Sequence, residues 1–263
     1  FASGCSLTVN GTLDAQGTRA APIVFTSQKD DTWGGDTNGD GISRGSPGDW
    51  KCLYVYGSAN MDYCNLIYGS NGNSTDDIIT VSGGTVDFKN GILAHGQRYA
   101  VGVESGHFYM SNSVVKDFYC VFRHWPYDPI VNCVIYDCTR LSNNNGQKLY
   151  NCIIQGISEA WDWSSGSGNT YSHCLIYNPQ SHELKTPPAN FVGVNGNIWN
   201  ADPKFVDPDN GDFRIASDSP CVDAGDGTVA PELDYYGQPR MDAKGKAATG
   251  VPNADGVCPD IGI

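Results

Sequence analysis

Six short segments of the sequence can be aligned on one another. They read MDYCNLIY, FKNGILAH, SNSVVKD, VNCVIYD, YNCIIQG and SHCLIYN. Their common column, in which successive members are 19 to 27 residues apart, consists of Cys64, Gly91, Ser113, Cys133, Cys152 and Cys174. Clusters of Gly, Asn, Ser and Asp, which favour turns, separate the copies. Because so short an apolar segment cannot bury a face by itself, we expect the copies to stack as successive coils around one core.

Two repeat folds have a period near 20 residues. The leucine-rich repeat needs an L-x-x-L-x-L frame, which a chain with only ten leucines does not supply. A parallel β-helix needs only short strands and sharp turns, and the 32 glycines suit such turns. The sequence therefore predicts an all-β protein: a single parallel β-helix over residues 1–205, with a loop insertion at 30–49, and an irregular closing segment at 206–263. A β-sandwich is the alternative, since it also has short strands at regular spacing.

The two ends of the chain carry longer motifs. Near the N-terminus stand LTVNGTLDAQGTRAAPIVFTS, GGDTNGDG and PGDW, and near the C-terminus stand ADPKFVDPDNGDFRIASDSPCVDAGD, YYGQPR and PDIGI. These motifs resemble the opening coils and the closing segment of secreted bacterial right-handed β-helix proteins of the pectate-lyase-like superfamily. The resemblance covers about residues 7–55 and 200–263 and implies a right-handed β-helix and secretion. It implies no single activity, because the superfamily includes lyases, hydrolases, adhesins and proteins of unknown role.

The charge balance limits the partners. The chain has 16 Lys and Arg against 29 Asp and Glu, a formal net charge of −13. Binding to nucleic acid without sequence preference requires cations that neutralise phosphates, and anionic membranes also attract basic segments. No apolar run approaches the roughly 18 residues that span a bilayer. We therefore expect neither a nucleic-acid partner nor membrane insertion.

Cysteine usage indicates an oxidising compartment. The ten cysteines include no CxxC pair and no Cys/His set with zinc spacing. Their even number, the acidic composition and the glycosylation-type sequons at Asn10 and Asn73 are typical of an extracellular or cell-surface protein. No charged start followed by an apolar run is present, as we expect of a mature or trimmed secreted chain.

The alignment also predicts where several cysteines lie. Cys133, Cys152 and Cys174 fall on one column, where neighbouring strands are about 4.8 Å apart, and we expect them to be largely buried. This spacing falls inside the range for disulfides, so the column consists either of free stacked thiols or of thiols that pair between coils. The residue before each of them should point outward; these residues are Asn132, Asn151 and His173.

Two cysteine pairs are candidates for disulfides. Cys120 and Cys138 are 18 residues apart and can meet on neighbouring coils. Cys221 and Cys258 flank the closing segment, where a bridge would hold the irregular end together. Cys5 is left without a predicted partner.

Residues 36–41 form the clearest local motif. They read DTNGDG, the first half of a D-x-N-x-D-G calcium loop, with oxygen ligands at alternate positions and glycine at the tight turn. Asp36, Asn38 and Asp40 are therefore candidate ligands of a structural calcium ion. The acidic residue usual at position twelve is missing. The residues that could replace it are Asp49, Asp30 and Asp31. The alternative interpretation is a solvated, turn-rich insertion.

Two carboxylates come together four residues after the common column. Asp117 and Asp137 would lie on adjacent coils, roughly 5 Å apart. A pair at that separation can carry out acid–base or nucleophilic glycosidase chemistry, or share a cation. The favoured interpretation is a turn column selected for its backbone geometry. This column consists of Tyr68, His95, Asp117, Asp137, Gly156 and Asn178.

Two further groups suggest contact with sugars. Lys116 and Arg123, with Trp125 nearby, combine a base, a cation and an aromatic ring that can stack on a sugar. Lyases of the superfamily use a lysine or arginine base with calcium or cationic residues that neutralise the uronate, but no motif here matches such a site residue by residue. Trp161 and Trp163 form a second aromatic group, which suits either sugar contact or the plugging of a solenoid end.

Two functional classes remain. The favoured one is a non-catalytic extracellular β-helix protein, a rigid surface element for attachment, polysaccharide contact or end-to-end assembly into fibres that covers unpaired strand edges. The alternative is a polysaccharide lyase or glycoside hydrolase that acts on an extracellular polysaccharide. The absence of a matched catalytic set argues against the enzyme, and the negative charge argues against polyanionic substrates unless calcium bridges them.

Overall fold

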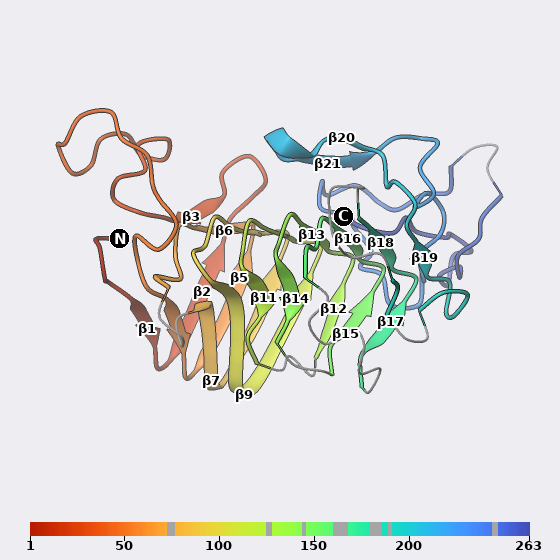
Figure 1. The fold of residues 1–263 in the computed structure, drawn as a ribbon, viewed down its shortest axis with the longest axis horizontal. Helices are drawn as coiled ribbons and strands as arrows, with labels where there is room; N and C mark the ends of the chain where they lie inside the picture. Colours follow the sequence, from red (N-terminus) through yellow and green to blue (C-terminus); the bar gives the residue numbers. More distant parts are fainter. Residues whose placement is uncertain are drawn as a thin grey trace.

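Two long parallel sheets are the main secondary structure of the described chain (Figure 1). The computed structural model describes residues 1–72, 77–124, 128–143, 146–159, 168–178, 186–188, 191–243 and 247–263. The sheets have eleven and eight strands, and every pairing within them is parallel. The all-β architecture is therefore confirmed, and the long parallel sheets are compatible with a parallel β-helix.

The strands are short, apart from two of 13 residues. The eleven-stranded sheet contains β1 (Leu7–Val9), β2 (Thr12–Gln16), β4 (Leu53–Val55), β5 (Ser58–Asp62), β7 (Asp77–Lys89), β9 (Tyr99–Ser111), β11 (Cys120–Phe122), β12 (Pro129–Val131), β14 (Arg140–Ser142), β15 (Lys148–Tyr150) and β17 (Thr170–Ser172). The eight-stranded sheet contains β3 (Ile23–Phe25), β6 (Cys64–Ile67), β8 (Ile92–Ala94), β10 (Val114–Lys116), β13 (Val134–Tyr136), β16 (Ile153–Gln155), β18 (Leu175–Tyr177) and β19 (Ile198–Trp199). An antiparallel pair, β20 (Phe205–Asp207) and β21 (Asp212–Ile215), encloses the 3-10 helix η1 (Pro208–Asn210).

The eight-stranded sheet has the register that the alignment predicts. Ile92 pairs with Val114, and Val114 pairs with Val134. Val134 then pairs with Ile153, and Ile153 with Leu175. Each of these residues directly follows a residue of the common column. Between two copies the chain forms strands of the other sheet; for example, β14 and β15 lie between β13 and β16 in the sequence. The alignment of the copies is therefore confirmed.

The short strands of this sheet are buried on both faces. In β16, Ile154 belongs to the main apolar core, whereas Ile153 belongs to a second apolar cluster. Phe213 and Ile261 of the closing segment are in that second cluster, so the closing segment covers the outer face of the sheet (Figure 1). Parallel strands covered on both faces carry continuous apolar runs. This double burial explains why the copies carry an apolar pair.

A column of asparagines joins the closing segment to the sheets. Asn112, Asn132 and Asn151 have left-handed φ values of 46°, 50° and 53° and are 4%, 0% and 0% exposed. Asn132 Nδ2 donates to the Gly262 carbonyl at 2.8 Å. Asn151 exchanges two hydrogen bonds with the backbone of Asp226, at 2.7 and 2.9 Å. Asn132 and Asn151, which the alignment expects to point outward, are thus buried because the closing segment lies over them.

The cysteine column is buried as predicted, and its thiols are free. Cys133, Cys152 and Cys174 are completely buried and precede the neighbouring strands β13, β16 and β18. His173, expected to point outward, is also buried, at 8% exposure. Burial raises the pKa of both Cys152 and Cys174 well above the ordinary thiol value, so these side chains stay protonated at neutral pH.

Neither candidate disulfide is formed. All ten cysteines lie among the described residues, and none of them is in a disulfide there. Cys120 and Cys138 donate instead to backbone carbonyls two residues away, at 3.3 and 3.5 Å. Cys221 packs in the second apolar cluster, whereas Cys258 is not part of that cluster.

The insertion at 30–49 lies between β3 and β4, and the boundary at 205/206 falls inside β20. Within the described ranges, no helix has the length and apolar character needed to cross a bilayer.

Candidate functional site

The insertion brings three carboxylates together. One oxygen each from Asp31, Asp36 and Asp40 lies within 4.8 Å of the others. Asp36 Oδ1 accepts the Gly39 N–H at 2.6 Å, and Asp36 Oδ2 accepts the Gly41 N–H at 3.0 Å. Both glycines have left-handed φ, 73° and 86°, which costs a glycine little and lets the loop curl around Asp36.

The donor set of this acidic loop (Asp31, Asp36, Asn38 and Asp40) fits a hard divalent cation, since Ca²⁺ is bound by carboxylate and amide oxygens. Asp31 Oδ1 is buried and has no hydrogen-bond partner. Within the described ranges, no Lys, Arg or His forms an ion pair with any of the three carboxylates. Like charges this close repel one another, so a bound cation would relieve the repulsion.

Asp49, a predicted ligand, lies outside this group and has another task. It accepts hydrogen bonds from Ser27 Oγ at 2.7 Å and from the Ser46 N–H at 2.9 Å, and Lys29 Nζ lies 3.4 Å away. Burial by itself would raise the pKa of Asp49, but these hydrogen bonds and the Lys29 charge lower it overall. Asp49 therefore holds the two ends of the insertion together. Of the candidates for the missing acidic ligand, Asp31 is the one that lies beside Asp36 and Asp40.

Arg123, a candidate cation for an acidic substrate, is buried and paired. Its Nε and Nη2 donate to the two carboxylate oxygens of Asp77, each at 2.7 Å, and Asp77 is 0% exposed. Thr80 Oγ1 donates to Asp77 at 2.8 Å, and Arg123 Nη2 also reaches Glu104 at 3.3 Å. A Cβ at Gly102 would lie 2.0 Å from Asp77 Oδ2, so the pair needs glycine there.

The neighbouring His124 completes this buried network. Burial and the charge of Arg123 lower the pKa of His124, so its ring is neutral at pH 7. Arg123 Nη1 donates to His124 Nε2 at 2.8 Å, which leaves the ring proton on Nδ1. Burial raises the pKa of the Asp77 carboxyl, and the hydrogen bonds and charge of Arg123 oppose that rise. With 6% exposure and these partners, Arg123 is not placed to meet a substrate.

Asp117 and Asp137 belong to a column of tight turns. They follow β10 and β13 and have left-handed φ values of 61° and 49°. The same backbone conformation occurs along the column at Tyr68, His95 and Gly156. The turn interpretation is therefore confirmed at these positions.

The side chains around Asp117 form a half-exposed cluster. His95 Nδ1 lies 2.7 Å from Asp117 Oδ2, and Lys116 Nζ lies 3.8 Å from the same oxygen. Lys116 ends a strand of the eight-stranded sheet, whereas Arg123 follows β11 of the other sheet. The two cationic residues that the sequence places close together thus lie on different sheets.

An exposed polar face, not anticipated above, covers β2, β5, β7 and β9. Its outward residues pair in register as three rows. The rows are Thr12–Ser58–Thr85–His107, Asp14–Asn60–Asp87–Tyr109 and Gln16–Asp62–Lys89–Ser111. None of these residues is buried. The signal was present in TLDAQ, SANMD, TVDFK and HFYMS, which all alternate polar and apolar residues with the period of a half-buried strand.

Side chains of the polar face are linked to one another. Asp14 Oδ1 accepts from Gln16 Nε2 at 2.8 Å and from Asn60 Nδ2 at 3.3 Å. The rings of His107 and Tyr109 stack with their centroids 6.0 Å apart. The polar face therefore presents donors, acceptors and stacked rings at the spacing of neighbouring strands, about 4.8 Å.

Some sequence candidates cannot be placed. Trp125, Trp161, Trp163 and Asn73 lie outside the described residues. Asn10, the other sequon asparagine, is exposed in the turn between β1 and β2.

Comparison with known proteins finds no family model, no curated protein and no solved structure that matches this chain.

Proposed function

We propose that this chain is a right-handed parallel β-helix that acts outside the cell, or on its surface, as a rigid non-catalytic element for contact with a neutral polysaccharide. Its handedness and secretion rest on the resemblance of the end motifs to proteins of the pectate-lyase-like superfamily. The coil architecture is supported by the parallel register of the copies and by the alternation of consecutive strands between two sheets.

A non-catalytic role is supported by the engagement of two of the candidate catalytic groups, Arg123 and Asp117. Arg123 is bound on two sides by Asp77 and Glu104 and is almost inaccessible. Asp117 is paired with His95 and occupies a turn position. Groups held in this way are positioned to stabilise the fold, and a lyase or hydrolase would need at least one acid, base or cation directed at substrate.

The polar face is the observation that carries the proposal. A polysaccharide repeats the same hydroxyls along its length, and rows of side chains at regular strand spacing meet successive units in similar ways. Tyr109 and His107 add ring surface for stacking on sugars. Asp14 and Asp87 on the face, with a net charge of −13, favour a neutral glycan over a uronate polymer.

The first prediction concerns binding through this face. Affinity electrophoresis in gels containing neutral glucans, mannans or xylans should retard the protein, and Tyr109→Ala should weaken the retardation severalfold because a stacking surface is lost. Tyr150→Ala is the matched control, since Tyr150 lies on β15 of the same sheet but outside the polar face. Equal effects of the two variants, or no retardation by any of these glycans, would contradict the proposal.

The same preparation tests for catalysis. We expect no cleavage of pectate, alginate, chondroitin or neutral glucans. New absorbance from unsaturated products, lost in Lys116→Ala, would instead favour the lyase alternative, because Lys116 is the partly exposed cation beside Asp117.

We also propose that the acidic loop binds one structural calcium ion. A ligand that binds only the folded state stabilises it by about 2.7 kcal/mol at a concentration 100 times its Kd. Chelation should therefore lower the thermal unfolding midpoint, and Asp31→Asn should remove this response. Asp49→Asn is the control: it should lower stability by loosening the ends of the insertion yet keep the response to calcium. An unfolding midpoint that chelator leaves unchanged would rule the ion out.

A further inference from the structure

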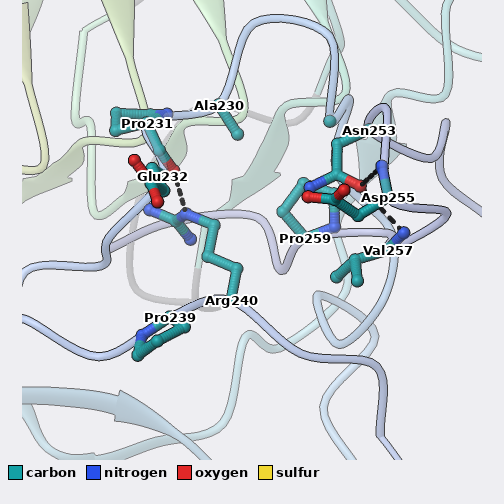
Figure 2. A pocket seen from close by; sticks show the side chains of 10 residues that line it. Ala230, Pro231, Glu232, Pro239, Arg240, Asn253, Asp255, Val257 and Pro259 are labelled. Carbon is teal, nitrogen blue, oxygen red and sulfur yellow. Dashed lines mark hydrogen bonds between the residues drawn. The ribbon is translucent and has the colours of Figure 1, made fainter.

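The closing segment encloses a small cavity of its own (Figure 2). Its volume is about 150 Å³, and residues of three stretches, 227–232, 239–240 and 253–259, line it. A cavity of this volume can hold a single six-membered ring, and it is smaller than the sites that hold drug-sized ligands. An occupant is therefore limited to one ring with its substituents directed at the opening.

The walls of this cavity are anchored to the asparagine column. Asn151 holds the backbone at Asp226, next to the first stretch, through two hydrogen bonds. Asn112 accepts from Arg240 Nη2 at 2.8 Å and donates to the Leu233 carbonyl at 2.8 Å. Two of the three stretches are thus attached, directly or through the adjoining residue, to coils of one sheet, so much of the cavity wall is fixed before any ligand arrives and little ordering is needed on binding.

Arg240 and Asn253 line the cavity on opposite sides (Figure 2). Arg240 donates Nε to the Pro231 carbonyl at 3.0 Å, and in the described part of the chain no carboxylate forms an ion pair with it. Asn253 Oδ1 accepts the N–H groups of Asp255 and Val257, each at 2.9 Å. The Asn253 amide nitrogen is therefore left to donate elsewhere.

Acceptors and apolar surface complete the lining. The exposed carboxylates of Glu232 and Asp255 lie at the cavity and take part in no ion pair within the described ranges. Pro231, Pro239 and Pro259 supply ring carbons that can contact an apolar ligand face (Figure 2). The two carboxylates disfavour an anion, and the guanidinium disfavours a cation.

We propose that this cavity binds one neutral pyranose unit. A pyranose presents C–H groups on its ring faces and hydroxyls that both donate and accept around its edge. The proline rings can contact the C–H groups of the ring faces. Arg240, Asn253 and the two carboxylates can donate to and accept from the hydroxyls. This site is separate from the polar face, so it does not depend on the function proposed for that face.

The test uses the whole chain and titration calorimetry with glucose, galactose, mannose and N-acetylglucosamine as probes. At least one should bind saturably to the wild type. Asn253→Asp keeps the oxygen that holds the turn but removes the amide donor, and Glu232→Gln keeps the shape but weakens the acceptor. Each should lower the affinity about tenfold, the loss of one good hydrogen bond to a charged or buried group. Arg240 is left unaltered because it also holds the closing segment to Asn112.

A control variant shows whether sugar binding depends on the cavity. Lys148→Ala, an exposed substitution on β15, should leave the affinity unchanged, and thermal unfolding of each variant verifies that it folds. The proposal is overturned if no neutral sugar binds, if Asn253→Asp and Glu232→Gln bind as the wild type does, or if phosphate or glucuronate binds in place of the neutral sugars. Loss of polysaccharide retardation in Tyr109→Ala with unchanged monosaccharide titration would show that the two sites are independent.

Discussion

Replacing Arg123 by alanine is expected to lower the free energy of unfolding by about 3–5 kcal/mol, the usual effect of removing one partner from a buried ion pair. The variant leaves the Asp77 carboxylate at 0% exposure, and among the described residues Thr80 then remains as its side-chain donor. Most of the loss comes from this uncompensated buried charge, because the net contribution of an intact buried pair is small. Urea unfolding followed by circular dichroism measures the change.

Arg214→Ala is the matched control for this experiment. Arg214 also binds an aspartate, Asp212, but its side chain is 61% exposed, and solvent screens such a pair, so we expect little change in stability. A double variant, Arg123→Met with Asp77→Leu, should recover part of the loss by removing both charges. If Arg123→Ala is no more destabilising than Arg214→Ala, the pair is not buried as described.

Two neighbouring isoleucines of β16 should give distinct results when replaced by alanine. Ile153 and Ile154 are both 0% exposed, and each substitution should cost about 2–5 kcal/mol through lost burial and a new cavity. Ile154 lies in the main core, so Ile154→Ala should destabilise the whole protein. Ile153 faces the closing segment, and a Cβ at Gly262 would lie 2.7 Å from Ile153 Cδ1, so Ile153→Ala should loosen residues 206–263 first.

Hydrogen exchange measured by mass spectrometry distinguishes these two outcomes. In Ile153→Ala, faster exchange should be confined to peptides of the closing segment, because local unfolding becomes easier in the segment that lost its contacts. In Ile154→Ala, peptides of both sheets should exchange faster. The same exchange pattern in both variants would mean that the closing segment does not form a layer separate from the core.

The sequence alone predicted six strands of the eight-stranded sheet and their register. Cys133, Cys152 and Cys174 are spaced like the copies that contain them, and the structure places them before adjacent strands. The turn column was also predictable, because Asp117, Asp137 and Gly156 are residue types that tolerate left-handed φ. Both features are local: each is encoded within one copy and repeated in the next.

The tertiary structure decided which residues from distant segments meet. Asp77 lies 46 residues from Arg123 in the sequence, and nothing near either residue indicates that they form a pair. Asn132 and Asn151 have the pattern of outward residues, yet residues of the closing segment cover them. Burial and ion pairing depend on which segments pack together. That packing follows from how the coils stack and from which part of the sheets the closing segment covers. A repeat pattern determines the stacking, but it contains no information on the path of an irregular segment over the stack.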